Sequence, residues 1–272
     1  MTKKILAVDL DGTLFTDDKK ICKKNLDALS EMLDAGHYLA VDTGRPTHVM
    51  KTLLHEFGVF DRDNVYLLGY QGTVGSKSTE DDVLFGHYLD NDAAIKLLEY
   101  SKAAGFSTLA FEYGTIYSFR QDENIEKYAE VSKETITIID SPEQLRGHQL
   151  TKMIVVDYDD SKALFDFEAK HKEEMAPYFE SMFSNVAFLE YVGVDTNKGS
   201  GLRELSEILG IPMEDTVACG DERNDICMIQ AAGVGVAVAN AREELKAHAD
   251  YITTLDNNEG AVAEAIYKFV LN

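Results

Sequence analysis

The chain has 272 residues, 45% of them hydrophobic, and its 48 acidic and 26 basic residues give a formal net charge of −22 at pH 7. This composition predicts a folded protein with enough core for one large or two moderate domains, and the lack of a lysine- or arginine-rich patch argues against a nucleic-acid partner. No apolar run approaches the length of a bilayer span and the first residues do not resemble a signal peptide, so we expect a cytoplasmic protein without a membrane partner.

Strand and helix patterns alternate in the first part of the chain. Apolar runs that predict strands and helical spacings that predict helices follow one another at residues 5–8, 25–35, 38–42, 46–57 and 64–68. Units of this kind are joined by right-handed crossovers and form a parallel sheet. The next segment, Gly72–Ser78, resembles a phosphate loop but has no glycine directly before Lys77, so we expect it to be a surface loop.

The pattern changes between residues 84 and 189. A strand pair across Glu112-Tyr113-Gly114 indicates antiparallel pairing, which differs from the flanking segments. We therefore predict an α/β fold of two domains. A discontinuous Rossmann-like core with a parallel sheet would comprise residues 1–83 and 190–272, and an inserted α/β domain with an antiparallel sheet would comprise residues 84–189.

Two aspartates stand at the end of the first predicted strand. Asp9-Leu10-Asp11-Gly12 follows the apolar run Ile5–Val8, which places both carboxylates at the carboxyl end of a buried strand, where open α/β sheets bind ligands. Two acidic groups this close repel each other and lose hydration unless a cation, hydrogen bonds or a proton relieves them. The pair therefore favours a divalent metal and proton transfer, although the motif alone is equally compatible with an acidic turn.

Two more aspartates follow a later predicted strand. Asp221 and Asp225 come after the apolar run 216–219 and lie one helical turn apart. If the strands that carry Asp9 and Asp221 are neighbours, up to four carboxylates meet in one crevice, an arrangement that suits an oxygen-coordinated Mg²⁺. The sequence does not prove this adjacency, and Asp221 alone could be a helix cap.

A site of this kind needs groups that neutralise a substrate. Lys198 stands at the start of a predicted helix, and Thr43 and Gly44 offer a hydroxyl and backbone N–H groups at the start of another. Each alone has a simpler interpretation, as a solvated lysine or a capping residue. Together with the four aspartates they indicate phosphoryl chemistry.

Four motifs, taken in order and in their strand–loop contexts, resemble those of the haloacid dehalogenase (HAD) superfamily. They are Asp9-Leu10-Asp11-Gly12-Thr13, Thr43-Gly44-Arg45, Lys198-Gly199, and Gly220-Asp221 with Asn224-Asp225. More narrowly, the chain is similar to the Cof-type phosphatases, which carry an inserted type C2 (C2B) α/β cap. The resemblance covers the whole chain and implies that the inserted domain sets substrate specificity.

The resemblance also implies a role for each matched residue. Asp9 would be the nucleophile that forms an aspartyl-phosphate, and Asp11 would be the general acid and base. Mg²⁺ would be held by Asp9, Asp221 and the backbone carbonyl of Asp11, with Asp225 as a further ligand or acting through a coordinated water. The groups that would contact the substrate are Thr43, Gly44, Lys198 and Asn224 at the phosphoryl oxygens, and Arg45.

Three positions depart from the usual pattern of this subgroup. The loop after the third strand commonly reads Asn-Gly-Ala, whereas here it is Gln71-Gly72-Thr73. Asp42 occupies a position where a small residue is frequent, and Glu222 adds an acid to the last motif. None of these differences removes a catalytic group that the resemblance implies.

We predict a phosphoric monoester hydrolase that uses Mg²⁺ to hydrolyse a small phosphorylated metabolite, such as a sugar phosphate, a nucleotide or a phosphorylated cofactor, as a monomer or weak homo-oligomer. One alternative is a sugar phosphomutase or phosphotransferase with the same active site. Another is a regulatory protein that binds a phosphorylated metabolite without catalysis. The intact set of Asp9, Asp11, Lys198 and Asp221 argues against this last function, because a binding protein has no need of a nucleophile.

Overall fold

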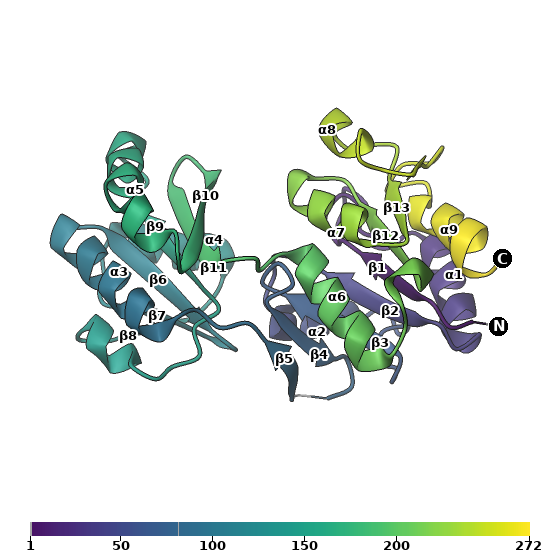
Figure 1. The fold of residues 1–272 in the computed structure, drawn as a ribbon, viewed down its shortest axis with the longest axis horizontal. Helices are drawn as coiled ribbons and strands as arrows, with labels where there is room; N and C mark the ends of the chain where they lie inside the picture. The colour runs from purple at the N-terminus through teal and green to yellow at the C-terminus, as the bar shows by residue number, and fades with distance from the viewer. Residues whose placement is uncertain (1, 81) are drawn as a thin grey trace. The chain divides into compact units, whose positions relative to one another are not determined.

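The computed structural model describes residues 2–80 and 82–272, which divide into two compact units (Figure 1). The first comprises the chain up to Gly86 together with Thr196–Asn272, and the second comprises His87–Asp195. The boundaries predicted from the sequence, after residues 83 and 189, lie a few residues earlier. The second of them falls inside strand β11 (Phe188–Gly193), which pairs along its length with strands of the inserted unit.

The first unit is built on a sheet of eight strands within the described residues, in the order β14-β13-β12-β1-β2-β3-β4-β5. The strands from β14 to β3 are parallel, and β4 and β5 pair antiparallel at one edge. This is the predicted α/β architecture. The strands are β1 (Ile5–Val8), β2 (Tyr38–Asp42), β3 (Val65–Gly69), β4 (Val74–Lys77), β5 (Val83–Gly86), β12 (Thr216–Gly220), β13 (Val234–Ala237) and β14 (Tyr251–Ile252).

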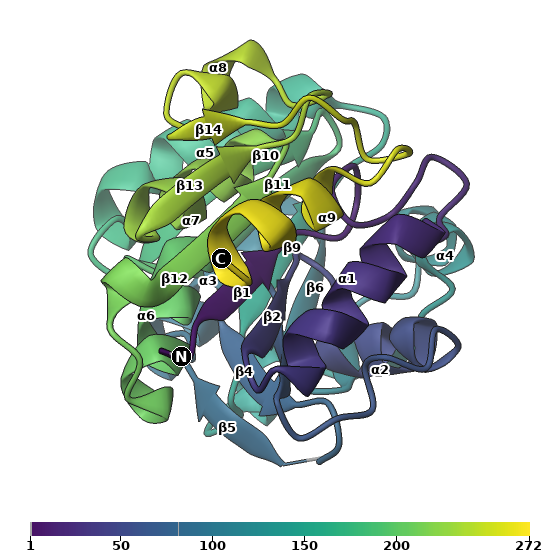
Figure 2. The ribbon, with the colours of Figure 1, turned by 90° about the vertical axis from the view of Figure 1, so that its right-hand side faces the viewer.

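Helices cover both faces of this sheet (Figure 2). One apolar cluster joins β1 and β2 to the helices α1 (Lys23–Asp34), α2 (Thr47–His55) and α9 (Ala261–Ala265). A second cluster joins the opposite face to α6 (Lys198–Leu209), α7 (Ile226–Ala231) and α8 (Glu243–Lys246). Because successive residues of a strand point to opposite faces, Leu6 and Val8 pack in the first cluster while Ile5 and Ala7 pack in the second.

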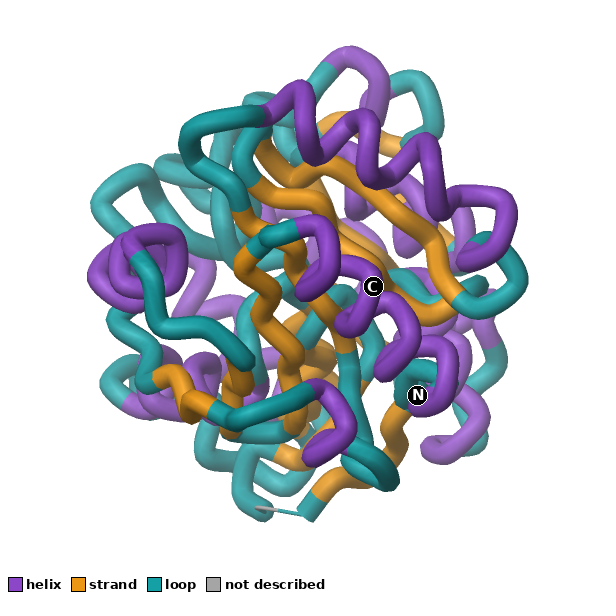
Figure 3. Tube along the Cα trace, turned by 90° about the vertical axis from the view of Figure 1, so that its left-hand side faces the viewer, coloured by secondary structure: helices purple, strands orange, loops and turns teal. Residues whose placement is uncertain are grey.

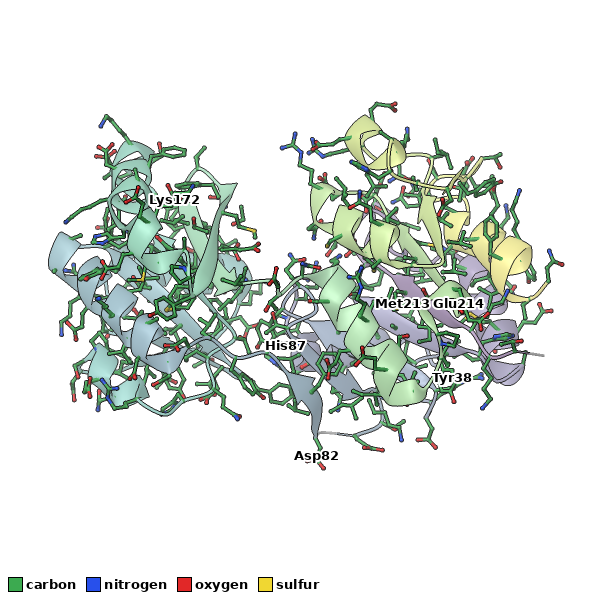
Figure 4. All side chains as sticks on the ribbon, viewed as in Figure 1. Tyr38, Asp82, His87, Lys172, Met213 and Glu214 are labelled. Carbon is green, nitrogen blue, oxygen red and sulfur yellow. The ribbon has the colours of Figure 1, made fainter. Side chains whose placement is uncertain are left out.

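The amino and carboxyl ends of the parallel strands lie at opposite edges of the sheet. Tyr38 begins β2 and Met213 precedes β12 in the turn Met213–Asp215, so these two residues, labelled in Figure 4, mark the amino-terminal edge. The predicted catalytic motifs follow the strands at the carboxyl-terminal edge. There Asp9 follows β1 and Asp221 follows β12.

The prediction of a surface loop over Gly72–Ser78 was wrong, because most of this segment is strand β4. Val74 to Ser76 are buried, and β4 pairs antiparallel with β3 from Tyr66 to Gly69. Gly75 lies under the ring of Phe85, which fills the space that a side chain at this position would occupy. Burial by β3 and β5 therefore outweighs the loop-like composition of the segment.

The inserted unit contains a mixed sheet, six strands of which are described, in the order β10-β11-β9-β6-β7-β8 (Figure 3). The pair β6–β7 is antiparallel across the predicted hairpin, and only β7–β8 is parallel. The elements are α3 (Asn91–Ala104), β6 (Ser107–Glu112), β7 (Thr115–Ser118), α4 (Glu123–Ser132), β8 (Ile136–Ile138), β9 (Lys152–Val156), α5 (Ser161–Met175), β10 (Phe179–Asn185) and β11.

The inserted sheet has its own apolar core. Helices α3 and α5 pack on one face against side chains such as Met153 and Leu189. On the other face Tyr128 of α4 lies edge-on to Phe111 and Phe188. This unit is therefore a separately packed domain by the usual criterion of a contiguous core. No described helix combines the length and the apolarity that crossing a membrane requires.

Candidate active site

A buried lysine joins two carboxylates at the carboxyl-terminal edge of the parallel sheet. Lys198 Nζ lies 2.5 Å from Asp9 Oδ1 and 2.6 Å from Asp225 Oδ1. Lys198 and Asp225 are fully buried, and Asp9 is nearly so. Burial lowers the pKa of Lys198, but the two carboxylates outweigh it and hold this pKa above its ordinary value. The ammonium group is therefore charged.

Neighbouring strands bring these groups together from distant parts of the chain. Strand β1 pairs with β12 in parallel, and the backbone N–H of Asp9 donates to the carbonyl of Cys219, so the two strand ends lie side by side. This adjacency is the one that the four-carboxylate crevice requires. Lys198 begins helix α6, where the Asn197 side chain accepts a hydrogen bond from the N–H of Ser200 and caps the helix.

Asp221 is oriented by the loop that follows β1. Thr13 Oγ1 donates a hydrogen bond of 2.7 Å to Asp221 Oδ1. Gly12 has a φ of +84°, and a Cβ atom at this position would lie 2.3 Å from Asp221 Oδ2. Position 12 thus favours glycine for two reasons, its left-handed backbone and the carboxylate of Asp221 packed against it.

Three carboxylates form a group that could hold a cation. Oxygens of Asp9, Asp221 and Asp225 lie within 4.8 Å of one another. Burial raises the pKa of Asp9 to about 7, although Lys198 opposes this, and burial raises the pKa of Asp221 to about 6. A cation would favour the ionised forms, and hard oxygen ligands suit Mg²⁺, so the donor set fits this metal.

The oxygens of Asp225 are largely engaged within the protein. Oδ1 accepts from Lys198, and Oδ2 accepts from the backbone N–H groups of Asp221 and Glu222 at 3.0 Å each. Asp225 therefore has two structural contacts: one oxygen binds the ammonium of Lys198, and the other binds the loop that carries Asp221. Asp9 and Asp221 have more of their lone pairs left for a metal ion.

The Asp11 carboxylate points to a different set of partners. Arg45 donates to its two oxygens at 2.8 and 3.0 Å, and Lys19 Nζ donates at 2.7 Å. Burial raises the pKa of Asp11, but the hydrogen bonds from Arg45 and Lys19 outweigh it and lower this pKa below its ordinary value. In this arrangement Asp11 is ionised, so it can accept a proton but has none to donate.

A pocket of about 300 Å³ opens where these groups meet. Its lining residues come from the loops after β1, β2 and β12, and include six of the residues predicted from the sequence. They are Asp9, Asp11, Thr43, Gly44, Arg45 and Asn224, together with Glu222. Three other predicted residues do not line the pocket: Lys198 binds Asp9 and Asp225, and Asp221 accepts a hydrogen bond from Thr13.

Asp42 is a buried acid for which the described part of the chain offers no hydrogen-bond partner. Val41 pairs with Val8 in the β1–β2 ladder, so Asp42 lies beside Asp9 on the sheet face that carries α6. It is fully buried, and neither of its carboxylate oxygens has a hydrogen-bond partner within the described residues. Burial raises the pKa of Asp42 well above its ordinary value, Lys198 opposes this rise, and Asp225 and Asp9 add to it.

Sequence reasoning missed several residues that contact the site. Lys19 binds Asp11, and nothing in the local sequence marks this lysine because the contact depends on how the loop after β1 folds back. Thr13 stands inside a quoted motif, but no role was predicted for it. Gln71 differs from the usual family residue, and the sequence pattern does not predict that its side chain contacts Asn224.

Known proteins resemble this chain in sequence and in fold. The chain matches the haloacid dehalogenase-like hydrolase family over residues 6–266. It is 28% identical to the 5-amino-6-(5-phospho-D-ribitylamino)uracil phosphatase of Bacillus subtilis, with 97% of each chain covered, and 28% identical to the pyridoxal phosphate phosphatase of Escherichia coli over 100% of both chains. The solved structure of a haloacid dehalogenase-like hydrolase from Bacteroides thetaiotaomicron has a TM-score of 0.83 and 30% identity, and the match covers 98% of this chain and 99% of that chain.

Gly12→Ala tests whether the loop after β1 positions Asp221. Gly36 has a similar φ of +85°, but nothing lies within 4 Å of the position that a Cβ atom would take there, so Gly36→Ala adds the backbone strain without the clash. We expect Gly36→Ala to lower the free energy of unfolding by about 1–2 kcal/mol with no change in activity. Gly12→Ala should cost more and also displace Asp221, so that catalytic activity falls by roughly a hundredfold. Equal activities of the two variants in a steady-state assay would contradict this role.

Asp42→Ala tests the effect of the unpaired acid on stability. Because its pKa is raised in the folded state, the folded protein keeps a proton that the unfolded chain releases above its ordinary pKa of 3.8. The free energy of unfolding of the wild type therefore falls as pH rises from that value towards the folded-state pKa. We expect the stability of Asp42→Ala relative to the wild type to increase as pH rises above the ordinary pKa of 3.8, by up to about 1.4 kcal/mol per pH unit, until the folded-state pKa of Asp42 is reached.

Urea denaturation in the presence of a chelator measures this difference at each pH. Asp42→Asn is the matched control for size, because it keeps the shape of the side chain but cannot titrate, and it should follow Asp42→Ala in its pH dependence. Parallel pH profiles of wild type and both variants would show that Asp42 does not titrate differently in the two states.

Proposed function

This chain belongs to the haloacid dehalogenase-like hydrolases, and from that premise we propose that it is a Mg²⁺-dependent phosphatase that acts on a small phosphorylated metabolite. The family predicted from the motifs and the enzyme class, a phosphoric monoester hydrolase, are confirmed. The type C2 assignment of the inserted domain, its role in specificity, the cytoplasmic location and the oligomeric state stay predictions.

One observation carries the proposal: the buried Asp9 carboxylate lines the same pocket as Asp11 and is held by the charged Lys198. A nucleophile must be held in position to attack phosphorus. Lys198 holds Oδ1 of Asp9 and does not bind Oδ2, which can make the attack. Phosphoryl transfer is catalysed mainly by such positioning and by charge that neutralises the phosphoryl oxygens.

The reaction then has two steps. An oxygen of Asp9 attacks phosphorus, the bond from phosphorus to the ester oxygen breaks, and that oxygen takes a proton from Asp11. In the second step Asp11 removes a proton from water, the water oxygen attacks the aspartyl-phosphate, and Asp9 and inorganic phosphate are released. Thr43, Gly44, Asn224 and Lys198 would hold the phosphoryl oxygens throughout.

Asp11 must gain a proton before the first step. In the structure Arg45 and Lys19 hold it ionised. A bound phosphate monoester offers Arg45 a second anion in the same pocket, because guanidinium groups bind phosphate in the same bidentate manner as carboxylate. Loss of Arg45 to the substrate raises the proton affinity of Asp11, which prepares it to act as an acid.

The metal would be held by Asp9 and Asp221, with Asp225 keeping both in place. When bound, Mg²⁺ supplies positive charge that stabilises the developing charge on the phosphoryl oxygens. The substrate class is small phosphorylated metabolites. The two relatives named for 5-amino-6-(5-phospho-D-ribitylamino)uracil and pyridoxal phosphate make phosphorylated cofactors and their precursors the first compounds to test, followed by sugar phosphates and nucleotides.

Asp9→Asn tests the nucleophile. The variant keeps the shape of the side chain but lacks the charged oxygen that attacks phosphorus, so we expect release of inorganic phosphate from an ester panel to fall about 10⁴-fold or more. Asp27→Asn is the control, because Asp27 is exposed on α1 and pairs only with Lys23 within the described contacts. Comparable turnover by Asp9→Asn would rule out the aspartyl-phosphate mechanism, and an isomerised phosphosugar in place of phosphate would identify a mutase.

Removal of metal tests the carboxylate group. A chelator should abolish phosphate release and added Mg²⁺ should restore it. At about a hundredfold excess over its Kd, Mg²⁺ should raise the melting temperature of the wild type by roughly 5 °C. Asp221→Asn can still accept the hydrogen bond from Thr13 but lacks the charge, so its melting temperature should not respond to Mg²⁺. An unchanged response in this variant would place the metal elsewhere.

A further inference from the structure

Gln71 connects two walls of the catalytic pocket. Its side-chain oxygen Oε1 accepts a hydrogen bond of 2.9 Å from Nδ2 of Asn224, which follows β12. Its side-chain nitrogen Nε2 packs on Gly44, which follows β2, so closely that a Cβ atom on Gly44 would lie 2.6 Å from it. Gly44 and Asn224 both line the pocket, whereas Gln71 is not among its lining residues. Gln71 is therefore placed to act on a bound phosphoryl group through Asn224.

The backbone at Gln71 is in an unfavourable conformation. Tyr70 and Gln71 have φ angles of 53° and 62°, and Gly72 follows at 81°, so three consecutive residues are left-handed. Each residue other than glycine costs about 1 kcal/mol or more in this region. Such strain persists only where the surrounding structure requires it.

Contacts with the site impose this turn. The N–H of Gln71 donates to the carbonyl of Thr43 at 3.0 Å, and the N–H of Tyr70 donates to the carbonyl of Arg45 at 3.1 Å. Gly72 packs against the start of α6, where a Cβ atom would lie 2.6 Å from the carbonyl oxygen of Asn197. The turn is thus fixed to both the Thr43–Arg45 loop and the helix that carries Lys198.

The residue type at this position is informative. A left-handed turn alone would favour glycine or asparagine, which reach this conformation at least cost. The left-handed conformation is not favourable for glutamine, but glutamine has one methylene more than asparagine, which allows its amide to reach Asn224. The side-chain contact, rather than the turn, therefore accounts for Gln71.

We propose that Gln71 is a positioning residue for phosphoryl transfer, which fixes the amide of Asn224 so that its second N–H group faces the phosphoryl oxygens. The proposal rests on the proposed function. The amide nitrogen of Asn224 has two N–H groups. One is bound by Gln71, which leaves the other for the substrate. Without this acceptor the amide can rotate and present its oxygen, which repels a phosphoryl group.

Gln71→Asn separates the side-chain contact from the backbone. Asparagine suits the left-handed turn better than glutamine but is one methylene shorter, so it loses the contact with Asn224. With p-nitrophenyl phosphate and Mg²⁺, we expect kcat/KM to fall about tenfold while the melting temperature stays equal or rises. A merely structural residue would lose stability and activity together. Lys133→Asn is the matched control, because Lys133 has a φ of 60° at the exposed end of α4, and this variant should keep wild-type activity.

A double-mutant cycle tests whether Gln71 acts through Asn224. In the Asn224→Ala background, Gln71→Asn should change kcat/KM less than about twofold, because the group that it positions is already missing. The same tenfold loss in both backgrounds, or wild-type kcat/KM in Gln71→Asn alone, would overturn the proposal. A wild-type protein that releases no phosphate would overturn the proposed function and this inference with it, whereas an active wild type with an unaffected variant would overturn only the inference.

Discussion

The buried ammonium group of Lys198, shared between Asp9 and Asp225, is the interaction on which the catalytic unit depends. Moving an ion from water into a protein interior costs several kcal/mol, so none of these charges would be stable at its position without the others. The contact joins the end of β1 to the starts of α6 and α7. It links residues that lie 189 positions apart in the chain, on either side of an inserted unit with its own core.

Three closely constrained features of the structure lie at the catalytic end of the sheet. Asp42 lies beside Asp9 with no hydrogen-bond partner among the described residues, Gln71 has a left-handed backbone where it contacts Asn224, and the Asp221 carboxylate fills the space next to Gly12. Buried like charges and strained backbones destabilise a fold, and they persist where the surrounding packing outweighs them. Two apolar clusters on the faces of the sheet provide that packing. Their burial stabilises the fold and offsets the destabilising groups at the carboxyl-terminal edge of the sheet.

Local patterns in the sequence were enough to predict much of the fold and the membership of the site. An apolar run that leads into an acidic glycine turn marks the end of a buried strand, because side-chain periodicity and turn preference are properties of a few adjacent residues. The α/β class, the hairpin at Glu112-Tyr113-Gly114 and the family followed from such patterns. The residues predicted from the four motifs lie together in the structure, although their individual roles are still predictions.

The tertiary structure decided what local patterns could not. It placed β1 beside β12. It also made a strand of Val74–Lys77, a segment whose glycine and lysine suggest a loop but which pairs with β3. It also turned Asp11 towards Lys19 and Arg45 and brought Gln71 to Asn224. Each of these contacts joins residues that are not adjacent in the sequence, and its energy depends on burial and on charges from other elements. The sequence by itself therefore determined which groups take part, and the packing of the sheet determined how each one is held.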